Sequence, residues 1–332
     1  MNNRERVLTS LHHKQPDKIP YQIIFTQKAY QRMAEYYGTS GFEANLNNCL
    51  YIRRARKEKQ EVAPDIVADE FGVRWDISLD KDIGVVCNRL VTSENLREYQ
   101  FPDPYDPTRY DGFEEVITTQ KDKFVVVSMG FSLFERAWSL AGMENVLMAM
   151  VADPGFVHEL LDRILDYHLK LIEYSCRYDI DAILLGDDWG QQRGLLMGPK
   201  LWREFIKPRI RQMYQLTKSK GKYVMIHCCG DIVRILPDLI EVGLDVFNPF
   251  QPEVMDVFEI KRKYGEALSF YGGISVQKTL PFGTVAEVKE EVSRLLDEVG
   301  KHGGYIASPA HAIPGDAKPE NIVAMLEVLD NQ

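Results

Sequence analysis

Apolar and polar positions follow a regular pattern from residue 124 to the end of the chain. Short runs rich in Val, Ile and Leu alternate with longer segments whose apolar residues recur at helical spacing. The predicted strands are Phe124–Met129, Ala182–Asp187, Tyr223–Cys228, Asp245–Phe250, Leu268–Gly272 and Gly304–Ser308. The predicted helices are Glu144–Met150, Pro154–Tyr178, Pro199–Ser219, Ile232–Val242, Val254–Tyr264, Val285–Val299 and Pro319–Leu329. Strands that alternate with helices indicate a parallel sheet.

The N-terminal third has a weaker pattern. We predict helices over Arg4–His12, Gln27–Tyr37 and Ala44–Glu61, and strands over Ile19–Phe25 and Val73–Ile77. These two strands and the six later ones make eight, which favours a closed (β/α)8 TIM barrel over an open sheet. The chain also has no G-x-G-x-x-G motif after its first strand, which argues against a dinucleotide-binding fold. We therefore expect one domain over residues 1–332, with an N-terminal helical extension of about 1–120 packed on the barrel.

Composition and charge narrow the classes of partner. The chain is 45% hydrophobic, enough for a large core, and its net charge of -9 argues against a nucleic-acid partner. A basic run within the third predicted helix is interpreted as a solvated face: Arg53, Arg54, Arg56, Lys57 and Lys59. The five cysteines have no disulfide-like spacing, and neither a signal peptide nor a transmembrane segment is evident. These features predict a cytoplasmic protein without a membrane partner.

Polar residues cluster where the predicted strands end. In α/β barrels the carboxyl ends of the strands meet at one mouth, which carries the catalytic groups. Five of the six runs that follow the later strands contain potential metal ligands or acid/base groups. The six runs are Gly130–Arg136, Gly186–Gly190, His227–Asp231, Asn248–Glu253, Gly272–Gln277 and Ser308–His311.

A candidate metal centre involves His227 and Cys229. The two residues are two apart at a strand end, so both side chains point to one face. Imidazole and thiolate are ligands that suit Zn²⁺, and His311, after the last strand, could supply a third ligand. The alternative is a buried cysteine beside a hydrogen-bonded histidine, and the sequence does not establish that His311 reaches the metal.

Carboxylates at two strand ends are candidates for acid/base chemistry. Asp187 and Asp188 directly follow the apolar run Ala182–Leu185, and Glu135 begins the helix that follows the strand Phe124–Met129. The alternative is that all three act as loop or helix-capping residues, since an acidic residue at a helix N-terminus is favourable by itself.

Five further residues are predicted to bind substrate: Gln251, Glu253, Gln277, Trp189 and Arg136. Each has an alternative role. Proline-rich turns also contain glutamine and glutamate without any function, and a tryptophan can pack in the core or at the rim.

The motifs at the strand ends resemble those of the uroporphyrinogen decarboxylase superfamily, which also contains cobalamin-dependent methyltransferases. The resemblance covers most of the chain, beginning near Arg6–Leu11. Its most distinctive segments are Phe71–Trp75, Gly186–Gly190, His227–Gly230, Asn248–Pro252, Gly272–Ile274 and Pro319–Ile322. The resemblance implies a TIM barrel, and is closest to the corrinoid-linked methyltransferases.

The resemblance also implies a chemistry. Methyltransferases of this superfamily hold zinc with H-x-C and a later Cys. His227 and Cys229 match the first two, whereas His311 stands where the later Cys is expected. The implied activity is zinc-assisted methyl transfer between a small methylated compound and a corrinoid protein. The corrinoid would reside on a separate partner, because the chain has no convincing D-x-H-x-x-G segment.

Two alternative functions stay open. Porphyrinogen decarboxylation without a metal is the first, and true decarboxylases carry an arginine-rich N-terminal loop for the substrate carboxylates. The corresponding segment Gln22–Tyr30 has no arginine pair, which favours the methyltransferase. The second alternative is a non-catalytic barrel that binds a small molecule or a corrinoid. The sequence leaves open whether the chain forms homo-oligomers.

Overall fold

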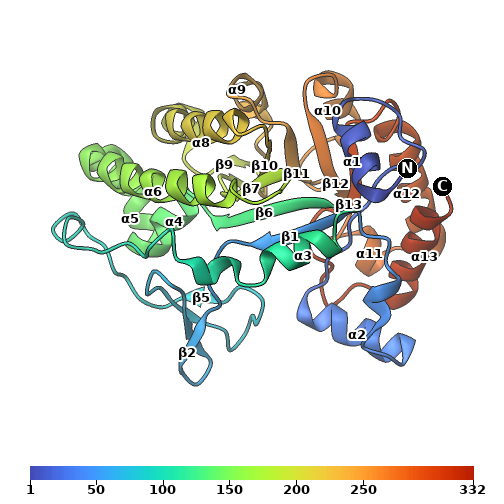
Figure 1. Ribbon diagram of the computed structural model, residues 1–332, viewed down its shortest axis with the longest axis horizontal. Coiled ribbons are helices and arrows are strands. Elements are labelled where there is room, and N and C mark those ends of the chain that lie inside the picture. Colours follow the sequence, from blue (N-terminus) through green and yellow to red (C-terminus); the bar gives the residue numbers. More distant parts are fainter.

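A curled parallel sheet of seven strands forms the centre of the computed structural model, which describes all residues 1–332 (Figure 1). The order of the strands across the sheet is β1-β6-β7-β10-β11-β12-β13. Their bounds are β1 Leu50–Arg54, β6 Phe124–Phe131, β7 Ala182–Gly186, β10 Tyr223–His227, β11 Val246–Phe250, β12 Ser269–Ile274 and β13 Tyr305–Pro309. All neighbouring pairs are parallel, so the carboxyl ends of the strands meet at one edge.

An extended segment near the N-terminus connects the two outer strands of this sheet. The amide of Gln22 donates to the carbonyl of Ala307 in β13 at 3.0 Å, and the amide of Ala307 donates to the carbonyl of Pro20 at 2.9 Å. On the other side, the amide of Cys49 donates to the carbonyl of Tyr21 at 3.0 Å, just before β1. The predicted strand Ile19–Phe25 is therefore an extended closing segment, bonded at isolated bridges because Pro20 has no N–H to donate.

Helices cover the outside of the sheet (Figure 1). The α-helices are α1 Asn3–Leu11, α2 Gln27–Tyr37, α3 Phe113–Thr119, α4 Phe134–Ala141, α5 Met143–Ala152, α6 Pro154–Ser175, α7 Gly198–Leu201, α8 Lys207–Ser219, α9 Leu236–Glu241, α10 Val257–Tyr264, α11 Thr279–Phe282, α12 Val285–Arg294 and α13 Pro319–Asp330. Short 3-10 helices are η1 Phe42–Asn45, η2 Pro107–Tyr110 and η4 Val233–Ile235, and π-helical turns are η3 Trp202–Ile206 and η5 Leu295–Val299. None of these helices is both long and apolar enough to cross a bilayer.

A small apolar cluster fills the inside of the barrel. Every strand of the sheet contributes at least one residue, and β6 and β7 contribute alternate residues, as expected for side chains that point inward. Its members are Val7, Leu11, Cys49, Leu50, Phe124, Val126, Ala182, Leu184, Met225, Val246, Tyr271 and Ile306. Val7 and Leu11 come from α1, so this helix closes the amino-terminal end of the barrel, and the carboxyl-terminal end stays available for a site.

Two predictions for the N-terminal third are wrong. The predicted helix Ala44–Glu61 contains η1, strand β1 and the start of β2. The predicted strand Val73–Ile77 does contain β4, but β4 belongs to a separate antiparallel sheet and not to the barrel. Barrel strand β1 was missed because its five residues end in two arginines, and a run of that length has no readable period.

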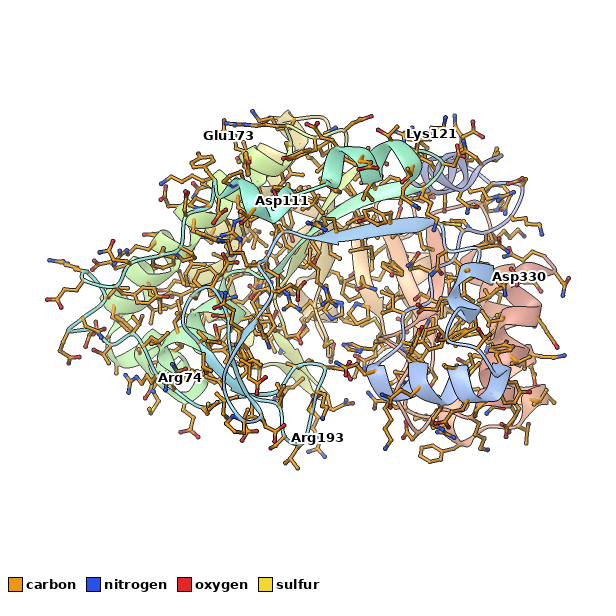
Figure 2. All side chains as sticks on the ribbon, turned by 60° about the horizontal axis from the view of Figure 1, so that its bottom comes forward. Arg74, Asp111, Lys121, Glu173, Arg193 and Asp330 are labelled. Carbon is orange, nitrogen blue, oxygen red and sulfur yellow. The ribbon has the colours of Figure 1, made fainter.

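The separate sheet has four short strands and follows β1 in the chain. Its strands are β2 Gln60–Ala63, β3 Ile66–Ala68, β4 Arg74–Asp76 and β5 Val85–Val86, and a further hairpin pairs β8 Gly190–Gln191 with β9 Gly194–Leu195. Figure 2 shows charged side chains such as Lys121 and Glu173 at the periphery of the molecule. Trp75 of β4 and the loops on either side of this strand line a cavity together with His311, so this region covers part of the barrel mouth.

Candidate functional site

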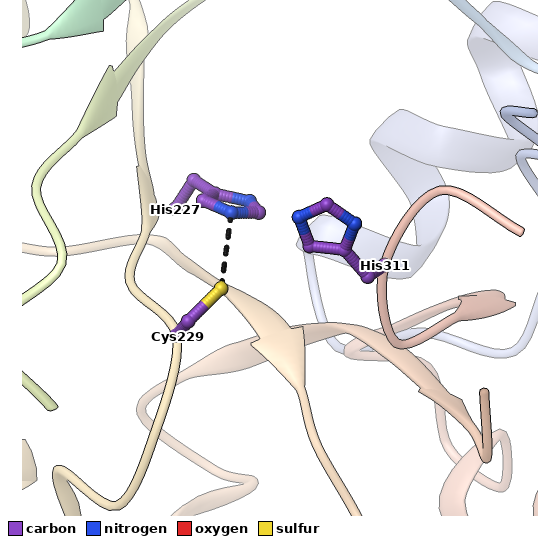
Figure 3. A group of neighbouring side chains, drawn as sticks. All are labelled: His227, Cys229 and His311. Carbon is purple, nitrogen blue, oxygen red and sulfur yellow. Dashed lines mark hydrogen bonds between the residues drawn. The ribbon is translucent and has the colours of Figure 1, made fainter. Parts of the chain in front are cut away.

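Three potential metal ligands meet at the mouth of the barrel (Figure 3). One ligand atom each from His227, Cys229 and His311 lies within 4.8 Å of the other two. Cys229 Sγ is 3.4 Å from His227 Nε2, and the ring centroids of the two histidines are 5.5 Å apart. His227 ends β10, Cys229 follows two residues later, and His311 follows β13. These two strands are separated in the sheet by β11 and β12, so the curl of the sheet brings their carboxyl ends together at the mouth.

The register of the sheet fixes the tautomer of His227. His227 in β10 pairs with Asn248 in β11, and His227 Nδ1 lies 2.6 Å from Asn248 Oδ1. Asn248 Nδ2 donates to the carbonyl of Tyr271 at 2.9 Å, so Oδ1 must be the acceptor that faces the histidine. His227 therefore carries its proton on Nδ1, and the lone pair of Nε2 is directed at Cys229 and the centre of the cluster.

Asp187 is completely buried and supports the neighbouring elements. Its Oδ1 accepts the backbone N–H of Glu135 at the start of α4 at 2.7 Å, and its Oδ2 accepts the indole N–H of Trp189 at 2.5 Å. Burial raises the pKa of Asp187 to about 7. Both oxygens are occupied by these bonds, so Asp187 holds β7, α4 and the following loop together behind the ligand cluster.

Asp188 and Glu135 lie close to the thiol. Asp188 Oδ1 accepts the backbone N–H of Cys229 at 2.7 Å and so fixes the loop that carries the sulfur. Burial first, and then repulsion from Asp188 and Asp187, raises the pKa of Glu135 well above its usual range. Burial, and then repulsion from Asp188 and Glu135, raises the pKa of the Cys229 thiol. The surroundings of the sulfur are therefore negative, and they favour a cation at the cluster.

The donor set fits a zinc ion. Two imidazole nitrogens and one sulfur are ligands that Zn²⁺ accepts, and three protein ligands leave a fourth position for a substrate. The hydrogen bond from His227 to Asn248 is the kind of support that metal-bound histidines usually have. Desolvation and then repulsion from His227 lower the pKa of His311, which favours the neutral imidazole that a metal binds.

Two cavities meet at His311. The first, which we name the aromatic cavity, has a volume of about 570 Å³ and extends from His311 beneath the antiparallel sheet. Its aromatic lining residues are Phe25, Phe71, Trp75, Phe131 and Tyr167. The second, which we name the glutamine cavity, has a volume of about 640 Å³. Its lining includes Gln191, Gln192, Gln251 and Gln277 together with Cys229 and His311.

The structure brings some of the predicted substrate-binding residues to these cavities. Gln251 and Gln277 line the glutamine cavity, and Gln251 Oε1 accepts the backbone N–H of Gly230 at 3.2 Å. Arg136 lines the aromatic cavity, where its guanidinium binds Asp69 at 2.9 Å and stacks 3.9 Å above the ring centroid of Phe71.

Two of the predicted substrate-binding residues lie outside both cavity linings. Trp189 is fully buried, and its indole packs edge-on against Trp202 at 5.3 Å between ring centroids. Glu253 accepts the hydroxyl of Ser275 at 2.6 Å and the backbone N–H of Gln277 at 3.2 Å. Glu253 therefore fixes the loop that carries Gln277 to the glutamine cavity.

Sequence reasoning missed the basic side of the aromatic cavity. Arg54, Arg56, Lys57 and Lys59 line this cavity and belong to β1 and the loop after it, so their assignment to a helix is wrong. Arg54 and Arg56 are exposed to solvent, as predicted. Arg54 follows Leu50 and Ile52 at alternate positions of β1, and so continues the inward-facing series at the mouth. A signal was present, since the residues that follow β1 are a strand-end run like the other six.

Known proteins resemble this chain in sequence and in fold. The family model described as uroporphyrinogen decarboxylase (URO-D) matches residues 2–332. A uroporphyrinogen decarboxylase from Chlorobium phaeovibrioides is 23% identical over 281 residues, covering 81% of this chain and 78% of its own. A methylated-thiol–coenzyme M methyltransferase from Methanosarcina mazei is 26% identical over 180 residues, covering 54% of this chain and 44% of its own.

A solved structure shows the same fold over nearly the whole length. A methyltransferase from Methanosarcina mazei superposes with a TM-score of 0.73 at 15% sequence identity, covering 99% of this chain and 98% of that one. This likeness confirms the TIM-barrel-like fold, and the relatives named above are enzymes of two kinds, decarboxylases and a methyltransferase. From the match across residues 2–332, the chain belongs to the uroporphyrinogen decarboxylase (URO-D) family.

Proposed function

We propose that the protein catalyses methyl transfer between a small methylated compound and a corrinoid carried by a separate protein, with zinc bound by His227, Cys229 and His311. The observation that carries the proposal is the position of these three residues, whose ligand atoms lie within 4.8 Å of one another where two cavities meet. Methyl transfer needs two reactants on opposite sides of one carbon, and two cavities that share His311 give each reactant its own approach. The methyltransferase relatives support the same class of reaction.

The bound zinc would act as a Lewis acid on the heteroatom that holds or accepts the methyl group. The residues of this chain prepare the site. Asn248 holds His227 in the tautomer whose Nε2 lone pair faces the cluster, and Asp188 holds the backbone of Cys229. Burial and two nearby carboxylates raise the pKa of Glu135, which favours the protonated form of its carboxyl group. We assign Glu135 and Asp188 to proton management, and Asp187 to positioning.

The two cavities have different roles in this proposal. The aromatic cavity, at about 570 Å³, has the size of a site for a small molecule. The glutamine cavity offers uncharged hydrogen-bonding groups on the other side of His311, and we assign it to the corrinoid partner. Gln251 and Gln277 would then contact the corrinoid or its protein.

The test is a spectroscopic methyl-transfer assay. Zinc-loaded protein is mixed with cob(I)alamin and a panel of methyl ethers, methyl thioethers and methylamines, and the formation of methylcobalamin is followed by absorbance. The proposal predicts zinc-dependent transfer from at least one donor, lost in Cys229→Ala. Release of CO₂ from uroporphyrinogen by chelator-treated protein, with no methyl transfer, would instead establish a metal-free decarboxylase. Tight binding of methyl compounds without any turnover would establish a binding protein.

A further inference from the structure

The aromatic cavity has hydrogen-bond donors that find no acceptor in the chain. Trp75 Nε1, Arg136 Nε and both ring nitrogens of His168 are buried without a partner, and all three residues line this cavity. Indole and guanidinium nitrogens can only donate, and a neutral imidazole has one N–H to donate. Buried polar groups are almost always paired in native proteins. Several unpaired donors around one cavity therefore point to a ligand that brings oxygen acceptors.

Two arginines in the same lining have no counter-ion. Two neighbouring cations are paired, Lys57 with Asp106 and Arg136 with Asp69, whereas Arg54 and Arg56 take part in no ion pair. Lys59 also has no carboxylate partner, but its ammonium group donates to the carbonyl of Ile83 and lies 4.2 Å from the ring centroid of Trp75. Desolvation and repulsion from Arg54 lower the pKa of Arg56. Two unpaired guanidinium groups that repel each other are stabilised when an oxyanion lies between them.

The acidic residues of the lining are engaged elsewhere. Glu70 forms a buried ion pair with Arg109, and Asp69 binds Arg136. Asp80 accepts the backbone N–H groups of Asp82 and Ile83, as in a tight turn. Asp82 accepts the backbone N–H of Gln27 at 3.1 Å, at the start of α2. None of these carboxylates forms an ion pair with Arg54 or Arg56. Asp69 and the neighbouring Glu58 attract the Arg56 guanidinium without pairing with it, so both arginines can still pair with a ligand.

The remaining walls suit a flat apolar body. Trp75 and Phe131 pack edge to face with their ring centroids 5.6 Å apart, and Phe71 and Tyr167 pack in the same way at 5.0 Å. These four rings line the same cavity as the two arginines and His311. Aromatic walls favour a planar apolar ligand, which gains contact area and offset or edge-on ring contacts.

We propose that the aromatic cavity binds a small planar organic carboxylate, with the carboxylate between Arg54 and Arg56 and the apolar body against Trp75 and Phe131. This assignment names the substrate class and rests on the proposed function, in which the methylated end of the molecule faces His311. Glycine, a β-branched amino acid or any compact aliphatic anion would leave the aromatic walls unfilled. A neutral aromatic compound would leave the two arginines unpaired.

The test compares two probes of the same shape on the full-length, zinc-loaded protein. Isothermal titration calorimetry measures the binding of 4-methoxybenzoate and of its neutral counterpart, 4-methoxybenzyl alcohol. We expect the carboxylate to bind at least tenfold more tightly. In the double variant Arg54→Gln/Arg56→Gln we expect its affinity to fall by about 10- to 100-fold, and the affinity of the alcohol to stay unchanged.

A matched control comes from the adjacent residue of the strand. Arg53 lies next to Arg54 in β1 but outside this cavity lining, and its guanidinium donates to the carbonyl of Arg109. Arg53→Gln should therefore leave the binding of 4-methoxybenzoate unchanged. Should the double variant fail to fold, the comparison of the two probes on the wild-type protein, repeated at high salt, still decides the question.

The outcomes separate this assignment from the proposed function. Equal binding of both probes, or equal binding of the carboxylate by wild type and double variant, overturns the assignment even if methyl transfer from neutral donors is found. Selective, arginine-dependent binding of the carboxylate supports it even if the protein transfers no methyl group. Binding needs no corrinoid partner, so the two proposals can fail independently.

Discussion

Replacing Asn248 by alanine tests whether the protein prepares His227 for a metal. Asn248 Oδ1 accepts the proton of His227 Nδ1 at 2.6 Å, and no other acceptor is bonded to that nitrogen. In Asn248→Ala the imidazole loses its orientation and can place its proton on Nε2, which removes the lone pair that would face the metal. The other two ligands are untouched by this change.

The expected loss of zinc affinity follows from the hydrogen bond between Asn248 and His227. Removing a hydrogen-bond partner of a metal-bound histidine typically lowers metal affinity by about 10- to 100-fold, or about 1.4–2.7 kcal/mol. The loss of the second bond, from Asn248 Nδ2 to the carbonyl of Tyr271, lowers the free energy of unfolding by about 1 kcal/mol in addition. Asn248→Asp keeps an acceptor for Nδ1, so its zinc affinity should stay closer to that of the wild type.

The assay is a competition titration of zinc between the folded protein and a chromophoric chelator. Asn321 provides a matched control, because this asparagine is also buried and donates to three backbone carbonyls, those of Thr279, Leu280 and Gly283. Asn321→Ala should lower stability without changing zinc affinity. Equal zinc affinity in wild type and Asn248→Ala would refute the idea that the sheet register prepares His227 as a ligand.

Three further changes test the walls of the site. Burial lowers the pKa of His168 from 6.5 to about 3, so the folded protein keeps it neutral while the unfolded chain binds a proton below about pH 6.5. The free energy of unfolding should therefore fall by about 2 kcal/mol between pH 7 and pH 5. Denaturant unfolding at both pH values measures this loss, which should be smaller in His168→Phe. Glu70→Gln leaves the buried guanidinium of Arg109 without its carboxylate, and should lower the free energy of unfolding by about 3–5 kcal/mol; a loss below 1 kcal/mol would contradict this. In Gly230→Ala the new methyl group would lie 2.4 Å from a backbone nitrogen of the β8–β9 hairpin, and the residue has a φ of +88°. In Gly221→Ala the φ is similar, at +70°, but no atom lies within 4 Å of the new methyl group. Gly230→Ala should therefore lower the free energy of unfolding more than Gly221→Ala does. Equal unfolding free energies for the two glycine variants would show that the hairpin does not constrain the metal-binding loop.

The later part of the fold could be predicted from the sequence because its strands are short, apolar and bounded by turns. Tyr223–Cys228 and Ala182–Asp187 are examples, and each agrees with an observed strand to within one residue at its end. The same reasoning failed at Leu50–Arg54. The last residue of this strand, Arg54, lines a cavity at the mouth, and consecutive charged residues there resemble the polar face of a helix.

The candidate site could be predicted in part for a similar reason. His227, Cys229 and His311 each follow an apolar strand, and the parallel sheet brings all such ends together, as the structure shows for these three. The aromatic cavity could not be predicted, since it combines the end of β1, the antiparallel sheet and helices α4 and α6. Contacts between segments so far apart in the chain leave no local pattern.

The most direct test of the account is the metal content of natively purified protein, measured by inductively coupled plasma mass spectrometry beside the variants Cys229→Ala and His311→Ala. We expect one zinc ion per chain in the wild type and a loss of zinc in both variants, with each variant still folded by circular dichroism. A wild-type protein that binds no zinc, even when zinc is added back under reducing conditions, would contradict the zinc-assisted mechanism. Loss of zinc in Cys229→Ala but not in His311→Ala would remove His311 from the ligand set.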